Sequence, residues 1–542
     1  MKNIIEKRST QAVLVGILIF ILLLATAKDI GLTWDEPAYI AAARSYTGWY
    51  QEFFTHPGQA LSDEVISQYW DVNHEHPPLD KIWSAFVFSI AKPFTDDLTA
   101  HRMGNMVLSA VLFGLVFYLM SREYGNLVGY ASVGALLTMP RFFFHAHLSA
   151  LDVPATFSFF AMIFFFWITL QKKDWKWGLL LGLIWGLALA IKINVIFVPI
   201  IIGIWWLIFS REMRIFWRVA IMGFSAIPIF WFSWPWLYHN TIDRFVEYIL
   251  FITVNHHKIG QYYLGQFYMP PPWHFAFVML WAVLPLGITI LYFTGIVKVA
   301  KSGKENKLGW LILISAIIPL LALAIGKSMV YDNDRLFMAS FPFLACLAGL
   351  GFGWLVDIWK GFTEKTTKRY LQPVGITALM LLAFMPPIIV GAQQYPHLLS
   401  YYGEGVGGLR GADKMGLETT YWCETYSLAL PFINEQAEPG DRIWVDPWSH
   451  DTLIYMQMEG LLRDDVKILS PSPTTSIFGE DAPQPVSLPI QLSDWIIVQH
   501  RQTSLGEEAE NNQALSYLAY LDKVYEYSYD GVTIFTLYKS NR

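Results

Sequence analysis

The chain has 542 residues, of which 54% are hydrophobic and only 15% are charged. A soluble domain carries about a quarter charged residues, so this composition argues against a soluble protein and for a membrane protein with several spans. The formal net charge of −6 is mild and indicates no nucleic-acid partner.

Apolar runs predict a polytopic α-helical protein with about 11 transmembrane helices, in a range of roughly 10 to 13, since a bilayer core needs about 20 apolar residues per helix. The first run lacks a clear small-residue cleavage site and more spans follow, so we expect a retained helix rather than a signal peptide. The predicted spans lie near 10–27, 103–120, 127–144, 153–170, 177–192, 194–210, 217–237, 275–297, 309–326, 336–356 and 371–392.

Basic residues predict the orientation of these spans. Lys and Arg gather in every second loop, for example in 172–176 and 211–218, and such loops stay cytoplasmic. The N-terminus is therefore predicted to be cytoplasmic in a multi-pass protein of the cell membrane. Three larger segments, about 28–102, about 238–274 and the region from about 393, are then extracytoplasmic.

The first outer segment does not have the composition of a soluble domain. It mixes the aromatic run "YTGWYQEFF" with "IWSAFVFSIAKPF", an apolar stretch that is too short to span a bilayer. Such stretches usually lie along the membrane surface, so we expect interfacial helices in this segment.

The C-terminal region changes character. "DRIWVDP", "VKILS" and "DWIIVQH" are typical of short buried strands, and helical patterns lie between them. "VYEYSYDGVTIFTLY" contains two alternating runs joined by Asp530-Gly531, which predicts a hairpin. We therefore expect a transmembrane domain over 1–392, a connecting segment over 393–419 and an extracytoplasmic α/β domain over 420–542.

Two adjacent acids, Asp35 and Glu36, stand in "GLTWDEPAYI", directly after the first span. Neighbouring carboxylates repel each other, which raises the pKa of at least one of them and suits a general base. The alternative is a helix start, because an acid before proline complements the helix dipole.

Histidines and a glutamate form two further groups on the same side. Glu75 and His76 lie in "NHEHPPLDK", and His256 and His257 lie in "VNHHKIGQYYLGQFY". Imidazole and carboxylate both suit zinc. The alternatives are a polar turn before an interfacial helix and a surface histidine pair.

Four charged residues are predicted near the outer ends of spans. Lys192 and Arg335 lie there against the inside bias of basic residues, so each needs a carboxylate or an anion such as a phosphate. For Arg335 the flanking Asp332 and Asp334 are the alternative partners. Two further candidates, in "PRFFFHAHLSALDVPATF", have structural alternatives of their own. Arg141 can extend along the membrane surface, and Asp152 can cap a helix.

All these groups converge on one membrane face, whereas the predicted spans hold few charges. A lipid or solute transporter would place ionisable groups near the middle of the membrane. A non-catalytic scaffold would use its C-terminal domain to bind partners. The convergence favours chemistry at the lipid–water boundary over both alternatives.

The motifs resemble those of GT-C glycosyltransferases, in particular the protein O-mannosyltransferase and aminoarabinose transferase group. The matching pieces extend over nearly the whole chain: "WDEPAYIAAA", "HEHPPLDK", "PRFFFHAHLSALDVP", "GLALAIKI", "NDRLFMASFPFLACLAGLG" and "YPHLLSYYGEGVGGLRGADKMGLETTYW". The resemblance implies the GT-C fold and transfer of a sugar, with inversion, from a polyprenyl-phosphate donor to an acceptor outside the cytoplasm.

The resemblance also implies roles for individual residues. Asp35 corresponds to the catalytic base, Glu36 to a structural or polarising neighbour, and Asp152 to a second acid near the pocket. Lys192, Arg141 and Arg335 are candidates for the donor phosphate, with His76 in place of a lysine that contacts it in the aminoarabinose group. Glu75 stands where some relatives bind a divalent metal ion, and His256 or His257 would be its second ligand.

One carboxylate suffices for this reaction. A lipid phosphate leaves readily and needs cations, while the acceptor hydroxyl is a poor nucleophile and needs a base. A retaining enzyme would also need a nucleophile. The identity of the sugar, and whether the acceptor is a protein, a glycan or a lipid, stay open.

Overall fold

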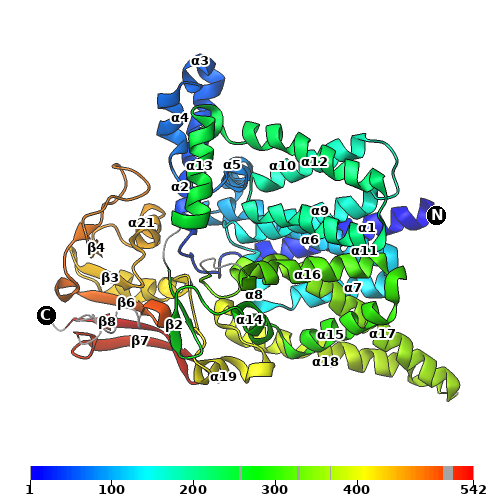
Figure 1. The fold of residues 1–542 in the computed structure, drawn as a ribbon. Helices are drawn as coiled ribbons and strands as arrows, with labels where there is room; N and C mark the ends of the chain where they lie inside the picture. The colour runs from blue at the N-terminus through cyan, green and yellow to red at the C-terminus, as the bar shows by residue number, and fades with distance from the viewer. Residues whose placement is uncertain (1, 256–258, 326–329, 367, 505–516, 541–542) are drawn as a thin grey trace.

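The computed structural model describes residues 2–540 except 256–258, 326–329, 367 and 505–516. A bundle of apolar helices occupies one side of the molecule and a β-sheet the other, and the two termini lie at opposite ends (Figure 1). The bundle contains α1 (Lys2–Thr26), α6 (Asp97–Tyr124), α7 (Asn126–Leu137), α9 (Asp152–Thr169), α10 (Lys176–Leu189), α11 (Phe197–Phe209), α12 (Met213–Phe232), α14 (Phe275–Val283), α15 (Leu286–Lys301), α16 (Lys307–Ile325), α17 (Phe341–Lys365) and α18 (Gln372–Gln394).

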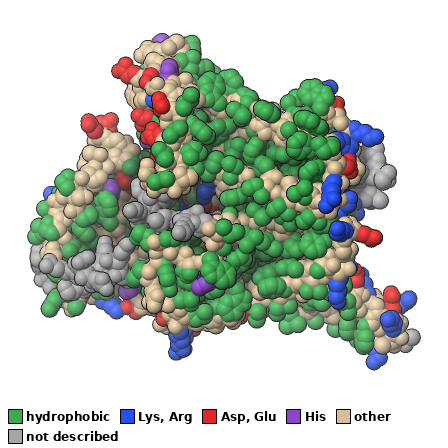
Figure 2. All heavy atoms as spheres, viewed as in Figure 1, with side chains coloured by type: hydrophobic (Ala, Val, Ile, Leu, Met, Phe, Trp, Pro, Cys, Tyr) green, Lys and Arg blue, Asp and Glu red, His purple; other side chains and the backbone are tan. Residues whose placement is uncertain are grey.

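Seven of the described helices are long and apolar enough to cross a membrane, and shorter apolar helices accompany them. Many large apolar side chains on their outer surfaces are exposed, as Figure 2 shows in green. Every predicted span coincides with one or more helices of the bundle. The predicted polytopic helical architecture is therefore confirmed.

Two predicted spans are interrupted. The span near 127–144 ends as α7 at Leu137, and a short helix, α8 (Pro140–His145), follows. The span near 275–297 breaks at Leu284 and Pro285 between α14 and α15. A proline stands at each break: Pro140 is the first residue of α8, and Pro285 directly precedes α15. The ring and the missing N–H of proline prevent the preceding helix from continuing.

Glycines allow a close contact between α15 and α17. A Cβ atom on Gly295 of α15 would lie 1.9 Å from the carbonyl oxygen of Leu347, and one on Gly351 of α17 would lie 2.0 Å from that of Leu291. Larger side chains cannot occupy these positions, so the two backbones meet directly.

Further helices are not part of the bundle. In the first outer segment these are α2 (Glu36–Thr55), α3 (Pro57–Ala60), α4 (Asp63–Trp70) and α5 (Leu79–Ala91). α13 (Thr241–Leu250) stands beside α2 (Figure 1). A small hairpin of β1 (Gln261–Tyr263) and β2 (Gln266–Tyr268) follows.

The C-terminal region contains the predicted strands. Its sheet has the order β5-β4-β3-β6-β8-β7, in which β5, β4, β3 and β6 are parallel. The hairpin turns at Asp530 and Gly531, whose φ angles are 52° and 77°. Two-residue hairpin turns need such positive angles, and Asp-Gly is among the dipeptides that adopt them. The elements are α19 (Gly408–Lys414), α20 (Leu430–Gln436), β3 (Arg442–Asp446), α21 (His450–Met458), β4 (Lys467–Ser470), β5 (Val486–Ser487), β6 (Trp495–Gln499), β7 (Asp522–Tyr529) and β8 (Val532–Lys539).

Candidate active site

The two adjacent acids have different surroundings. Glu36 is fully buried, and Arg102 donates to it from Nε and Nη2, each at 2.7 Å. The backbone N–H groups of Thr33 and Ser149 donate to the same carboxylate at 3.0 and 2.9 Å. Although burial favours the neutral form, Arg102 outweighs it and lowers the pKa of Glu36. Glu36 therefore holds the loop after α1 in place.

Asp35 faces a cavity instead. It occupies the N-cap position of α2, but within the described residues its side chain makes no capping hydrogen bond. Its Oδ2 accepts from Nη1 of Arg335 at 2.6 Å. Burial raises the pKa of Asp35 while Arg335 opposes that shift. A partly exposed carboxylate with a raised pKa has the properties of a general base.

The cavity beside Asp35 measures about 670 Å³ and lies where the helices and the sheet meet. Side chains from both ends of the chain line it. They include Trp34, Asp35, Tyr39, Glu75, His76, Tyr331, Asp332, Arg335, Trp422, Trp448, His450, Asp451 and Arg501.

Arg335 is held from several sides. Asp332 lies 3.3 Å from its Nε, and its guanidinium lies over the rings of Trp422 and Tyr331, at 4.6 and 5.1 Å from their centroids. The predicted pairing of Arg335 with Asp332 is thus present. Asp334, the other predicted partner, binds Arg141 instead.

A second, smaller cavity of about 120 Å³ adjoins the first and shares Tyr39, His76, Tyr331 and Arg335 with it. Lys192 and Asp152 also line it, with their Nζ and Oδ1 atoms 2.9 Å apart. About a fifth of the Lys192 side chain is exposed, so Lys192 pairs with a carboxylate and is still accessible.

An apolar groove of about 600 Å³ continues from there along the bundle. Ile193, the residue after Lys192, lines both the groove and the smaller cavity. Side chains from α10, α12 and α13, such as Leu189, Phe224 and Phe245, form its walls. The order along the molecule is therefore apolar groove, Lys192, Arg335 and Asp35.

Arg141 lies apart from these spaces. It is 1% exposed, contacts Asp334 at 2.5 Å and donates to the carbonyl oxygen of Tyr401 at 2.9 Å. It is not among the described residues that line either cavity. Its partners, Asp334 and the carbonyl oxygen of Tyr401, give it a structural position.

Glu75 and His76 both line the main cavity. Glu75 accepts from Nδ2 of Asn73 at 3.1 Å. His256 and His257, the expected second metal ligand, lie outside the described residues. Among the described residues no group of three or more His, Cys, Asp or Glu side chains could hold a metal ion.

Lys81 shapes the loop that carries Glu75 and His76, a role that the sequence did not suggest. It is almost fully buried, and its Nζ donates to Oδ1 of Asn73 at 2.8 Å and to the carbonyl oxygen of His76 at 2.9 Å. Burial lowers its pKa to about 8. The sequence shows Lys81 at the end of "HPPLDK", but no local pattern indicates that its side chain contacts the preceding loop.

The C-terminal sheet closes the far side of the cavity. Trp448, His450 and Asp451 follow β3, Ile477 follows β4 and Arg501 follows β6. These strands are parallel, and in open α/β sheets ligands lie outside the carboxyl ends of the strands. Here the same edge faces Asp35 and Arg335.

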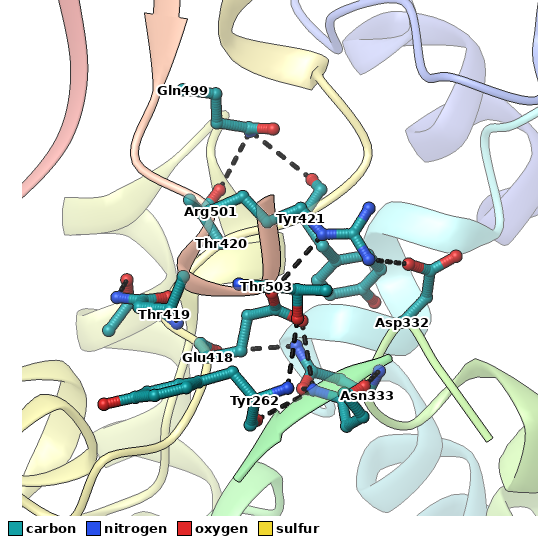
Figure 3. A network of polar contacts seen from close by, with 12 residues as sticks. Tyr262, Asp332, Asn333, Glu418, Thr419, Thr420, Tyr421, Gln499, Arg501 and Thr503 are labelled. Atoms are coloured by element: carbon teal, nitrogen blue, oxygen red, sulfur yellow. Dashed lines mark hydrogen bonds and ion pairs between the residues drawn. The ribbon is translucent and has the colours of Figure 1, made fainter. Parts of the chain in front are cut away.

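A network of polar contacts joins this edge to the bundle (Figure 3). Arg501 donates from Nη2 to Oδ1 of Asp332 at 2.7 Å, and its Nε lies 3.3 Å from Oε1 of Glu418. Gln499 contacts the segment 420–423 and Thr503 contacts Glu418 and Tyr262. The C-terminal region and the site are therefore one connected structure.

The chain is similar along its whole length to solved membrane protein structures. The crystal structure of ArnT from Cupriavidus metallidurans in the apo state has a TM-score of 0.53 and 12% identity, and covers 97% of this chain and 98% of that chain. The same protein bound to undecaprenyl phosphate has a TM-score of 0.50 and 14% identity, with 97% of each chain covered. The chain has the GT-C fold.

The GT-C resemblance in the sequence is thus confirmed. In addition, residues 75–239 match the family described as dolichyl-phosphate-mannose-protein mannosyltransferase. No curated protein sequence matches the chain. The family match covers the first outer segment from Glu75 and the helices through α12, so it contains Lys192 and Asp152 of the smaller cavity.

Proposed function

We propose that the chain is a membrane glycosyltransferase that moves a sugar from a polyprenyl phosphate to an acceptor hydroxyl, with inversion, and that Asp35 is the general base. The main support for this proposal is the order in which an apolar groove, two cations and a carboxylate follow one another. An apolar groove leads to two cations, Lys192 and Arg335, and then to a carboxylate with a raised pKa.

This order matches the parts of the donor. A polyprenyl chain is apolar and suits the groove, which exposes almost no polar surface between α10 and α12. The phosphate that follows the lipid suits Lys192 and Arg335, since guanidinium and ammonium groups are the usual partners of phosphates. The sugar then lies in the larger cavity beside Asp35. ArnT from Cupriavidus metallidurans, which has the same fold, binds undecaprenyl phosphate.

The proposed reaction balances with the groups present. Asp35 takes the proton of the acceptor hydroxyl as the oxygen bonds to the anomeric carbon. The bond from that carbon to the phosphate oxygen breaks on the opposite face, which inverts the configuration. The leaving phosphate gains negative charge, and Lys192 and Arg335 stabilise it. No covalent intermediate is needed.

The contact between Arg335 and Asp35 has a consequence in this scheme. In the structure Arg335 pairs with Asp35 at 2.6 Å. A donor phosphate competes for the same guanidinium and so leaves Asp35 freer to accept a proton. Binding of the donor therefore prepares the base.

We further propose that this site faces the outside of the cell. Lys and Arg side chains gather at the end of the bundle that holds the N-terminus, which favours a cytoplasmic position for that end (Figure 2). The sheet and the cavity lie at the opposite end (Figure 1). The donor lipid and acceptor would then meet at the outer membrane surface.

The direct test uses a panel of polyprenyl-phosphate sugars with the purified chain and natural membrane acceptors, and mass spectrometry of the released lipid phosphate. The proposal predicts release with at least one donor. Transport of a labelled lipid across vesicle membranes without any sugar transfer would support a transporter instead.

A further inference from the structure

Arg501 reaches the site from a distant part of the chain. It follows β6 of the C-terminal sheet, is 6% exposed and lines the main cavity. Its guanidinium joins two carboxylates, Asp332 at 2.7 Å and Glu418 at 3.3 Å. Figure 3 shows Arg501 above Asp332 and Glu418, at the centre of the network.

Asp332 divides its carboxylate between two arginines. Oδ1 accepts from Arg501, while Oδ2 lies 3.3 Å from Nε of Arg335. Arg335 in turn reaches Asp35 through Nη1. The charges alternate along this chain of contacts, so loss of Arg501 would leave the whole Asp332 carboxylate to pair with Arg335.

The backbone at Asp332 needs outside support. Asp332 and Asn333 have φ angles of 55° and 57°, which residues other than glycine rarely adopt. Gln261 contacts the backbone N–H of Asn333 at 3.2 Å and the Glu418 carboxylate at 3.0 Å. Glu418 also accepts from the backbone N–H of Thr503 at 2.9 Å. The network therefore holds both the side chain of Asp332, through Arg501, and the backbone next to it, through Gln261.

We propose that Arg501 is a positioning residue for Arg335, acting through Asp332. By occupying one oxygen of Asp332, it prevents that carboxylate from pairing fully with Arg335. Arg335 then keeps its charge directed at the cavity, where it can bind the phosphate of the donor. This inference rests on the proposed function, and it makes the C-terminal sheet part of the donor site.

The test needs a variant that keeps the buried charges balanced. Arg501→Gln alone would leave the buried Glu418 without its cation and Asp332 with Arg335 as its only arginine partner, and an unpaired buried charge destabilises proteins strongly. The double variant Glu418→Gln/Arg501→Gln removes one charge of each sign. Its matched control is Arg442→Gln/Asp494→Asn, which removes an ion pair with contacts of 2.8 and 3.0 Å in the same sheet, away from the cavity.

The measurement is the affinity of the purified full-length chain for undecaprenyl phosphate. The double variant is expected to bind it about tenfold more weakly than the wild type, a change that is easily resolved. The control variant should bind like the wild type. Thermal unfolding of both variants verifies that they are folded.

A double-mutant cycle separates positioning from direct contact. Arg335→Gln alone should weaken binding. If Arg501 acts through Arg335, adding the double substitution to Arg335→Gln causes little further loss. Fully additive losses would show that Arg501 acts independently of Arg335 and would overturn the inference, as would wild-type affinity in the folded double variant. A wild-type chain that does not bind undecaprenyl phosphate would contradict the proposed function as well.

Discussion

At the scale of single residues, the two adjacent acids have different partners. Asp35 and Glu36 are neighbours in sequence, yet Glu36 is buried against Arg102 and Asp35 opens to a cavity beside Arg335. The turn into α2 separates the two side chains. One acid is therefore enclosed by the fold, and the other faces the cavity, where we propose that it acts as the base.

Asp35→Asn tests the chemical role. The amide keeps the size of the side chain but cannot accept the proton, so turnover should fall by about 10²–10⁴, the usual contribution of a general base. Initial rates of lipid phosphate release measure this effect. Unchanged thermal unfolding serves as the control, and near wild-type turnover would contradict the assignment.

The pH dependence gives a second test of Asp35. The ionised form is the active base, so activity is lost as the pH falls through the pKa of Asp35. Because burial raises that pKa above the ordinary value of 3.8, the acidic limb of kcat/KM should lie above this value. A limb at or below it would show that Asp35 is not the titrating base.

Glu36→Gln should instead affect folding. It leaves the guanidinium of Arg102 buried without its counter-charge, which costs about 3–5 kcal/mol when a buried ion pair is broken. Thermal unfolding measures the loss. Glu526→Gln, at an exposed pair with Lys523, is the control and should leave the unfolding temperature unchanged.

The sequence predicted some of these residues and not others. Asp35, Glu36, Glu75 and His76 stood in short motifs, so local spacing was enough to select them. Arg102 lies inside an apolar helix, 66 positions from Glu36, and Arg501 lies 169 positions from Asp332. Such contacts depend on the packing of distant segments, which no local pattern contains.

At the scale of elements, hydrophobic runs predicted the helices well but not their interruptions. Prolines at 140 and 285 were visible in the sequence, yet the apolar runs continue past them. The strands were predictable because short apolar runs bounded by polar residues differ clearly from the long spans. Their carboxyl edge faces the cavity because the sheet docks in one orientation, which only the three-dimensional structure reveals.

The groove between α10 and α12 gives a prediction at this scale. Gly223 lines the groove, and a Cβ at this position would meet open space. Gly223→Leu should therefore fill the path of the lipid without disturbing packing, and raise the Kd for undecaprenyl phosphate by about tenfold or more. Titration of the purified variant measures the change.

Gly203→Leu is the matched control. Gly203 also faces open space, but it lies on α11 and is not among the groove residues in the described part of the chain. Its affinity should equal that of the wild type. Equal affinities for both leucine variants would show that the lipid lies elsewhere.

At the scale of the whole molecule, the proposed orientation places the sheet outside the cell and the N-terminal end of the bundle inside it. Both cysteines, Cys346 and Cys423, are buried, so single introduced cysteines can report sidedness without background. A membrane-impermeant maleimide should label Glu480→Cys in the exposed C-terminal region of intact cells. It should label Lys304→Cys only after the membrane is opened. The reverse pattern would contradict the proposed orientation.

The central claim is that Asp35 promotes release of a lipid phosphate by activating an acceptor hydroxyl. The most direct measurement compares wild type and Asp35→Asn in membranes that supply natural acceptors, with polyprenyl-phosphate sugars as donors and mass spectrometry of the released lipid. The account predicts release by the wild type and a loss of about 10²–10⁴ in the variant. Equal release by the two proteins with every donor would contradict it.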